Sequence, residues 1–287
     1  MVFFPPAKLN LGLHITGKRD DGFHDLESVF LPIGWSDILE VVIDEEVPQG
    51  QARFEWTGLA IPGDTVDNLV TRAHKRLADA LELPGVSIYL HKVLPMGGGV
   101  GGGSANGTYT LRALNEVCKL GLSNDALMTH AAELGSDCPF FVQDAPALVR
   151  GRGEIVEPLR DELPLRGWWV VVANPGIHIR TAEAFADLTP APRSTDWNAL
   201  STMPVTAWEQ VIQNDFEVGA RQRHPQIGQL IDAISKAGAA YAQMTGSGST
   251  VFGLFEHEGV AREAARRTQA QFCAPIFRDF RSALKGA

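Results

Sequence analysis

Hydrophobic and polar residues alternate along residues 7–15. The apolar positions are Leu9, Leu11 and Leu13. The positions between them carry Lys8, Asn10, Gly12 and His14. Because successive side chains of a strand point to opposite faces, this pattern predicts a strand with one face in a core and a polar face directed at another group.

The pattern of hydrophobic and polar residues also predicts the other strands and helices of the chain. Strands are expected over residues 23–33, 37–44, 86–94, 168–174 and 275–280, with a strand–turn–strand unit over 241–255. Helices are expected over residues 71–83, 105–119, 123–134 (capped by Ser123), 225–237 and 259–272. The absence of a regular strand–helix–strand repeat favours the α+β class over a doubly wound sheet. A loop-rich stretch near residues 151–164 predicts two domains, 1–155 and 156–287.

Residues 95–106 read PMGGGVGGGSAN and contain six glycines within seven positions. Glycines lack the Cβ atoms that keep a backbone away from a ligand. The helix expected directly afterwards offers free N–H groups and the positive end of its dipole, which together predict a phosphate site. A flexible linker is the alternative, although linkers do not usually join a strand directly to a helix. The loop lacks Walker A and dinucleotide signatures, so a nucleotide triphosphate site of another design is indicated.

Phosphoryl transfer also needs a metal, a positive charge and a group that orients or deprotonates the acceptor hydroxyl. Ser104 is the candidate hydroxyl ligand for phosphate or metal, and an ordinary helix N-cap is its alternative. Asp137 is the candidate base, or an exposed turn carboxylate. Lys8 is the candidate for stabilising the charge that develops during transfer, and its alternative is a solvated charge on an edge strand. The Gly246–Ser249 turn is a second phosphate nest or a plain hairpin turn.

The net charge, the cysteines and the lack of long apolar runs limit the kinds of partner and the compartment expected for this protein. The net charge of −9 disfavours binding to nucleic acid or to an anionic membrane, which both need a basic surface. The three cysteines show no disulfide framework and no zinc spacing, which favours a reducing compartment. No signal-peptide pattern opens the chain and no apolar run reaches transmembrane length. We therefore expect a cytoplasmic protein that acts on a small molecule.

Five segments together resemble the GHMP kinase family, which includes galactokinase, homoserine kinase and mevalonate kinase. They are residues 6–11 (PAKLNL), 21–26 (DGFHDL), 94–106, 134–141 and 244–252. The resemblance implies a two-domain α+β GHMP kinase fold. Its N-terminal ATP-binding domain resembles the second domain of ribosomal protein S5. Its C-terminal domain is ferredoxin-like and completes the substrate site.

The resemblance also implies roles for individual residues. Lys8 and Asp137 match the catalytic pair, Phe23 would stack on a cytosine and His24 would hydrogen-bond to it. Further substrate-side positions are Asn10, Lys92, Thr181 and Phe185. ATP would be bound by Asn68 and by the loop residues Pro95, Met96, Gly97, Gly98, Gly99, Val100, Gly101, Gly102, Gly103, Ser104, Ala105 and Asn106.

Two positions depart from the family pattern. Ala105 stands where a serine is usual, so one hydroxyl is absent near the phosphates or the metal. Phe23 stands where tyrosine is common, which preserves stacking and removes a phenol hydrogen bond. The residues that ligate the metal stay open, with Ser104 as the candidate.

Within the family, the match implies phosphorylation of the 2-hydroxyl of 4-diphosphocytidyl-2-C-methyl-D-erythritol by ATP with Mg²⁺, in non-mevalonate isoprenoid precursor biosynthesis. One alternative is another GHMP kinase, of the homoserine or mevalonate type. The other is a sensor that binds ATP and ligand without turnover, against which Lys8 and Asp137 together speak. The aromatic Phe23 beside His24 favours the cytidyl substrate. The sequence leaves both a monomer and a homodimer open.

Overall fold

The computed structural model describes residues 1–186 and 188–276, and the contacts within them divide the chain into two compact units. The first unit comprises Met1–Lys8, Lys18–Met96 and Val100–Pro158. The second comprises Leu9–Gly17, Gly97–Gly99 and the chain from Leu159 onwards. Each unit therefore contains segments that are distant in sequence. The expected domain division at residues 155 and 156 stays a prediction.

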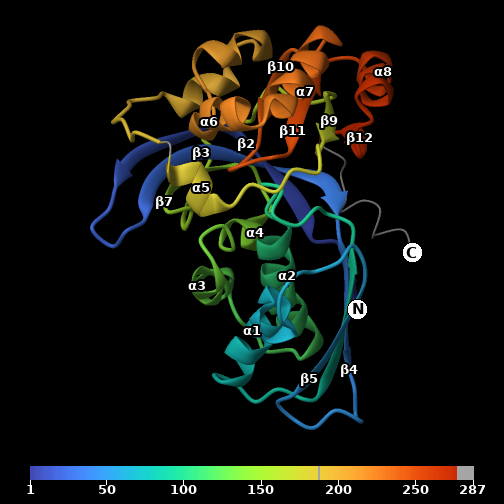
Figure 1. The fold of residues 1–287 in the computed structure, drawn as a ribbon. Coiled ribbons are helices and arrows are strands. Elements are labelled where there is room, and N and C mark those ends of the chain that lie inside the picture. Colours follow the sequence, from blue (N-terminus) through green and yellow to red (C-terminus); the bar gives the residue numbers. More distant parts are fainter. Residues whose placement is uncertain (187, 277–287) are drawn as a thin grey trace. The chain divides into compact units, whose positions relative to one another are not determined.

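The first unit contains a four-stranded sheet in the order β1-β4-β6-β5, of which Figure 1 labels β4 and β5. Its strands are β1 (Val2–Phe3), β4 (Ile38–Ile43), β6 (Val86–Lys92) and β5 (Ala52–Gly58). The helices of this unit are α1 (Leu69–Ala78), α2 (Gly102–Val117), α3 (Asn124–Leu134) and α4 (Phe140–Gln143), after the 3₁₀ turn η1 (Thr65–Asp67). Leu39, Ile88 and Leu114 are fully buried in the core that the sheet shares with α1 and α2.

A second sheet contains β3 (His24–Ser36), β7 (Ala147–Gly151) and β8 (Ile155–Pro158) as antiparallel neighbours. The long strand β2 (Pro6–Lys18) begins in the first unit and continues in the second. Every residue of β2 from Ala7 to Ile15 is buried, including Lys8, Asn10 and His14. The predicted strand is confirmed, and its polar face is buried as completely as its leucine face.

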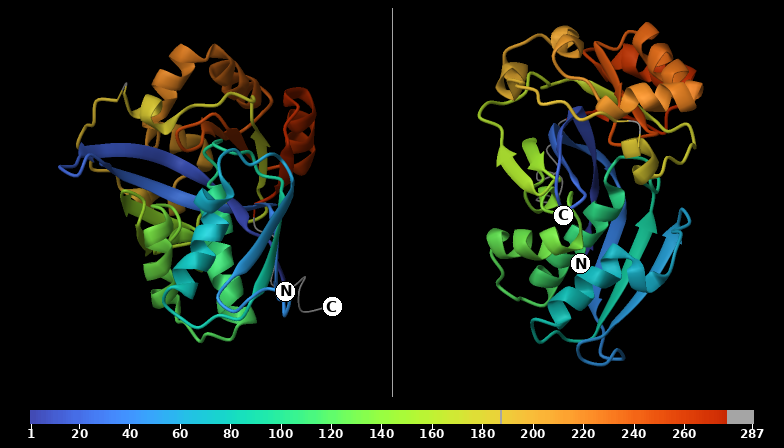
Figure 2. Two further views of the ribbon diagram at one scale, coloured as in Figure 1. Left: turned by 60° about the horizontal axis from the view of Figure 1, so that its bottom comes forward. Right: turned by 60° about the vertical axis from the view of Figure 1, so that its left-hand side comes forward.

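The second unit contains the antiparallel sheet β10-β11-β9-β12, whose strands are labelled in Figure 1 and shown from two further sides in Figure 2. Its strands are β9 (Trp169–Ala173), β10 (Tyr241–Met244), β11 (Val251–Phe255) and β12 (Phe272–Pro275). Its helical elements are α5 (Thr181–Ala186), η2 (Trp197–Ser201), η3 (Val205–Gln210), α6 (Asp215–Arg223), α7 (Pro225–Lys236) and α8 (Glu258–Thr268). Helix α7 packs on β10 and β11, whereas α8 packs on β9 and β12. This β-α-β-β-α-β arrangement confirms the ferredoxin-like prediction.

Several predicted boundaries were wrong. The helix expected from residue 105 begins at Gly102, inside the glycine-rich segment. The helix expected to reach residue 272 ends at Thr268, because Gln269 adopts a left-handed conformation with φ of 52°. The chain then forms β12 over Phe272–Pro275, whereas the last strand was expected over residues 275–280. Residues 277–280 of that expectation lie outside the described part of the chain.

Within the described residues, no helix combines the length and the apolar character needed to span a bilayer.

Candidate active site

Lys8 and Asp137 form an ion pair in the first unit, with Lys8 Nζ 3.4 Å from Asp137 Oδ2. Lys8 lies near the start of β2, and Asp137 follows the end of α3, where Gly135 is the C-cap. The Lys8 side chain is 4% exposed, which rules out the alternative of a solvated edge charge. The Asp137 side chain is 30% exposed, so its carboxylate remains accessible to a ligand.

Burial has the largest effect on the pKa of Lys8. Desolvation lowers the pKa of its ammonium group, and the charge of Asp137 opposes that shift. The ammonium group also lies over the Phe30 ring, 4.2 Å from its centroid. The Lys8 backbone N–H donates to the carbonyl of Val100 at 2.9 Å. These contacts fix the ammonium group beside Asp137 and the glycine-rich segment.

Gly153 packs against the carboxylate of Asp137. A Cβ atom at this position would lie 2.8 Å from Asp137 Oδ1, and the residue has a φ of 126°. Only glycine meets both conditions without displacing the carboxylate. Gly153 could not be predicted from the sequence, because the turn that contains it carries no spacing that points to Asp137.

The glycine-rich segment delivers the chain into α2. Gly101 is the N-cap, has a φ of 72° and supplies no side-chain cap to the first turn. A Cβ at Gly101 would lie 3.0 Å from both Lys8 Cγ and Phe141 Cζ, so glycine permits the close approach. The first turn of α2 therefore presents N–H groups without a side-chain cap beside Lys8, which is the arrangement that binds phosphate.

Ser104 is the third residue of α2, so its alternative as the helix N-cap was wrong. Its hydroxyl is close enough to the Cys138 thiol to lower the pKa of that thiol slightly against the larger effect of burial. Burial raises the pKa of the Cys138 thiol to about 11, so this cysteine is an inert, protonated neighbour. Ala105 is fully buried in the hydrophobic core. The hydroxyl that Ala105 lacks would therefore lie in the core.

A cavity of about 180 Å³ brings together Asn68 and Asn106, two of the residues that the family resemblance assigns to ATP. Asn68 caps α1 through a bond from Val70 N to its Oδ1, at 2.9 Å. Asn106 is 3% exposed, and its Oδ1 has no hydrogen-bond partner among the described residues. An unpaired buried acceptor that lines a cavity is a suitable partner for a ligand N–H group, such as the amino group of adenine.

Lys92, expected on the acceptor side, lines the same cavity as Asn68, Asn106 and Met96. Its Nζ lies 2.6 Å from Asp37 Oδ2, and both side chains are almost completely buried. Burial lowers the pKa of Lys92, while the negative charge of Asp37 opposes the shift. The acceptor-side assignment of Lys92 stays a prediction, and its position favours the nucleotide side.

Phe23 and His24 lie at the turn that leads into β3. Phe23 is 50% exposed, and the guanidinium of Arg152 lies 4.8 Å from the centroid of its ring. Asp21 Oδ1 accepts a hydrogen bond from Phe23 N at 3.1 Å, which fixes the backbone of the turn. The ring therefore offers an exposed, oriented surface on which a base could stack. His24 is the first residue of β3.

In the second unit, Asn10 is completely buried against the turn between β10 and β11. Its Oδ1 accepts from Thr245 Oγ1 at 3.1 Å and from Gly246 N at 2.9 Å. Asn214, whose role no local sequence pattern predicts, donates through Nδ2 to the carbonyls of Met244 and Gly246. The Asn10 side-chain oxygen thus stabilises the second glycine-rich turn, and the substrate-side role of Asn10 stays a prediction.

This turn packs directly on the first three glycines of the loop. Thr250 N donates to Gly98 O at 3.2 Å, and a Cβ at Gly99 would lie 2.2 Å from Thr245 O. The close approach excludes any larger residue at Gly99. The turn is therefore more than a plain hairpin connection, because it fixes the backbone of residues 97–99.

Thr181 and Phe185 lie one turn apart on α5 in the second unit, so they share a face of that helix. The Phe185 ring packs edge-on against Phe216, with centroids 4.9 Å apart. Their predicted substrate role stays a prediction.

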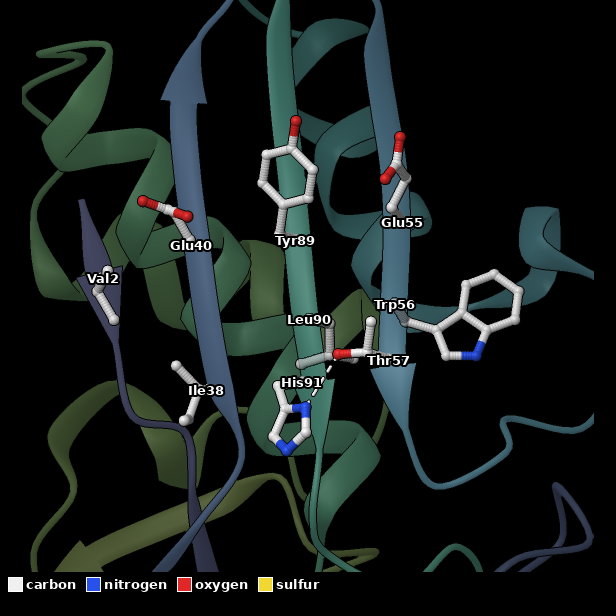
Figure 3. Close-up of a pocket in the computed structure, with 9 residues that line it drawn as sticks. All are labelled: Val2, Ile38, Glu40, Glu55, Trp56, Thr57, Tyr89, Leu90 and His91. Atoms are coloured by element: carbon white, nitrogen blue, oxygen red, sulfur yellow. Dashed lines mark hydrogen bonds between the residues drawn. The ribbon is translucent and has the colours of Figure 1, made fainter.

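A second cavity, of about 230 Å³, opens on the face of the β1-β4-β6-β5 sheet that is turned away from the helices (Figure 3). Tyr89 lies between Glu40 and Glu55 on neighbouring strands. His91 Nδ1 and Thr57 Oγ1 are hydrogen-bonded at 2.9 Å. None of the predicted site residues lines this cavity.

Comparison with known proteins gives a consistent result. The family model "GHMP kinases N terminal domain" matches residues 68–151, and "GHMP kinases C terminal" matches residues 194–272. The 4-diphosphocytidyl-2-C-methyl-D-erythritol kinase of Bacteroides thetaiotaomicron is 40% identical over 95% of this chain and 98% of its own length. The same-named kinase of Cytophaga hutchinsonii is 37% identical over 89% of this chain and 92% of its own.

Solved structures agree. A crystal structure of 4-(cytidine 5'-diphospho)-2C-methyl-D-erythritol kinase superposes with a TM-score of 0.78 at 30% identity, covering 94% of this chain and 95% of that one. Homoserine kinase from Cytophaga hutchinsonii has a TM-score of 0.66 at 17% identity, covering 93% of this chain and 88% of that one. This second likeness shows the fold alone.

Proposed function

The chain belongs to the GHMP kinase family, and from this premise we propose that it phosphorylates the 2-hydroxyl of 4-diphosphocytidyl-2-C-methyl-D-erythritol with ATP. This reaction would serve non-mevalonate isoprenoid precursor biosynthesis in the cytoplasm. The observation that carries the proposal is the identity of about 40%, over nearly the whole length, to relatives that bear the name of this kinase. The Lys8–Asp137 pair beside the start of α2 supports phosphoryl transfer as the chemistry.

Asp137 accepts or orients the proton of the acceptor hydroxyl, because it is the accessible carboxylate of the pair. Lys8 stabilises the negative charge that develops during transfer, and its burial strengthens that interaction. Gly153 leaves room for the carboxylate in this position.

Membership of the family implies the use of ATP. The backbone N–H groups at the start of α2 bind its phosphates, and Asn68 and Asn106 bind its adenine. No cluster of three or more His, Cys, Asp or Glu side chains that could bind a metal occurs in residues 1–186 and 188–276. Mg²⁺ does not need such a cluster, since it is commonly held by one or two protein oxygens plus phosphates and water. Ser104 would hold it together with the phosphates and water, and it would neutralise phosphate charge.

Two alternatives are less well supported. The homoserine and mevalonate kinases that match this chain share its fold at 13–17% identity, which does not carry their substrates over. A non-catalytic sensor would not need a buried lysine paired with an accessible carboxylate. The proposed kinase activity is compatible with either a monomer or a homodimer.

The test is a ³¹P NMR assay of the purified protein with ATP, Mg²⁺ and one acceptor at a time. The acceptors are the cytidyl methylerythritol, homoserine and mevalonate. We expect a new phosphomonoester signal with the cytidyl acceptor alone. Phosphorylation of homoserine or mevalonate in its place would assign another GHMP activity, and ATP binding without any product would indicate a sensor.

We expect Phe23→Ala to raise KM for the cytidyl acceptor about 5- to 100-fold, because one base–aromatic stack contributes roughly 1–3 kcal/mol. Affinity for ATP should not change. Steady-state kinetics with each substrate varied in turn measure both constants. Phe4→Ala is the matched control, since Phe4 is 46% exposed and has no proposed role. A loss confined to ATP would show that the two pockets were assigned the wrong way round.

Ser104→Ala should lower kcat more than Ala105→Ser does. The Ala105 position is in the core, where a new hydroxyl can bond back to the carbonyl of Gly101 one turn earlier. We expect Ala105→Ser to change kcat less than about 3-fold. For Ser104→Ala a drop of about 3- to 10-fold is expected, the size of one hydrogen bond. Titration of kcat with Mg²⁺ separates the two variants, and equal effects would mean that the loop acts through its backbone alone.

A further inference from the structure

Asp37 is a completely buried carboxylate in the single-residue connection between β3 and β4. Its Oδ1 accepts hydrogen bonds from Val93 N at 2.6 Å and Leu94 N at 2.8 Å. Its Oδ2 accepts from Lys92 Nζ at 2.6 Å. One side chain thus binds three consecutive residues at the point where β6 ends and the glycine-rich segment begins.

The ammonium group that Asp37 holds lies next to the first turn of α2. A Cβ atom at Gly102, the first residue of α2, would lie 3.0 Å from Lys92 Nζ. Lys92 also lines the cavity that contains Asn68 and Asn106. A positive charge and the positive end of a helix dipole are therefore placed together beside this cavity.

Holding two such positive groups together is unfavourable unless a negative group balances them. Asp37 supplies one full negative charge, and its hydrogen bonds fix the direction of the Lys92 side chain. Without this partner, a lysine that is 1% exposed would lose its proton or turn towards solvent. Asp37 itself does not line the cavity, so any effect on a ligand passes through Lys92 and the backbone after it.

We propose that Asp37 is a positioning residue for the nucleotide, holding the Lys92 ammonium group at the start of α2, where the phosphates of ATP bind. The proposal rests on the proposed function in that the nucleotide is ATP. It is tested by direct binding, which needs neither an acceptor nor turnover.

The experiment measures Kd for ATP with Mg²⁺ by isothermal titration calorimetry for four proteins: the parent, Asp37→Asn, Lys92→Met and the double variant. Asparagine keeps an oxygen for the two backbone N–H groups and removes the anionic partner of Lys92. We expect Asp37→Asn to weaken ATP binding about 10-fold, close to the lower limit for hydrogen bonds to charged groups. In the Lys92→Met background the same substitution should have no further effect on Kd.

Thermal melting separates positioning from folding. Lys92→Met leaves a buried carboxylate without its cation and should lower Tm, whereas the double variant should recover part of that loss. If Asp37→Asn alone fails to fold, the comparison of Lys92→Met with the double variant still decides the matter. Equal Kd values support positioning through Lys92, and weaker binding in the double variant overturns it.

Asp44→Asn is the matched control. Asp44 follows the other end of β4 and accepts hydrogen bonds from Ser87 Oγ and Glu46 N, but it does not line the cavity. Its substitution should leave Kd for ATP unchanged. Parent-like ATP binding by folded Asp37→Asn would overturn the proposal while leaving the proposed function intact. If the parent binds ATP normally and phosphorylates no acceptor, the proposed function fails and the Asp37 result still stands.

Discussion

Asp137→Asn is expected to lower kcat by about 10²- to 10⁴-fold, the usual contribution of a general base. The amide keeps the shape of the carboxylate and cannot take the proton of the acceptor hydroxyl. ATP binding should change little, because Asp137 lies outside the cavity that contains Asn68 and Asn106. Single-turnover kinetics with saturating ATP would measure the loss in the chemical step directly.

The substitution also has a predictable effect on stability. Asp137 opposes the downward pKa shift that burial imposes on Lys8, so its removal should lower that pKa further and reduce Tm. Asp125→Asn, in the exposed first turn of α3, is the control and should leave kcat unchanged. A folded Asp137→Asn variant with a kcat within a few-fold of the parent would remove Asp137 from the chemistry.

Lys8→Met is expected to lower kcat by about 10²- to 10³-fold with almost no change in Tm. The loss follows from removing one preorganised positive charge from a buried position. Stability should persist because methionine fills a similar volume on the Phe30 ring, and because the carboxylate left without its cation, Asp137, is 30% exposed and can be solvated. Steady-state kinetics and thermal melting on one preparation measure both quantities.

The control for Lys8 is Lys75→Met. Lys75 is 73% exposed and pairs with Asp79 one turn away on α1, so its loss should cost little stability and no activity. Lys8→Arg gives a second comparison, because arginine keeps the charge but presents a larger, planar group. If Lys8→Met were as active as the parent, the lysine would be a structural partner of Asp137 and no more.

The sequence predicted the parts of the molecule that local patterns specify. The glycine-rich segment before a helix and the Ser123 cap were found because each depends on residues adjacent in sequence. The start of α2 was placed too late, because two glycines form its first turn and helix propensity argues against them. The alternative that Ser104 is the N-cap of this helix was wrong for the same reason, because the helix begins before Ser104.

Other features depend on contacts between distant residues and left little local signal. Asp37 meets Lys92 across 55 positions of the chain, and Gly153 meets Asp137 through a turn of ordinary composition. The short strands β7 and β8 fall in or beside a stretch that reads as loop. Strand β7 forms because it pairs with β3, and β8 forms because it pairs with β7, so both depend on tertiary contacts.

A chain cut between Pro158 and Leu159 would yield two fragments that are each structurally incomplete. The C-terminal fragment would lack Leu9–Gly17, and with it the Asn10 side chain that binds Thr245 and Gly246. The N-terminal fragment would carry that strand without its partners. We therefore expect the halves to accumulate in folded form only when produced together. A chimaera that exchanges the C-terminal half with a relative would have to exchange the N-terminal strand as well.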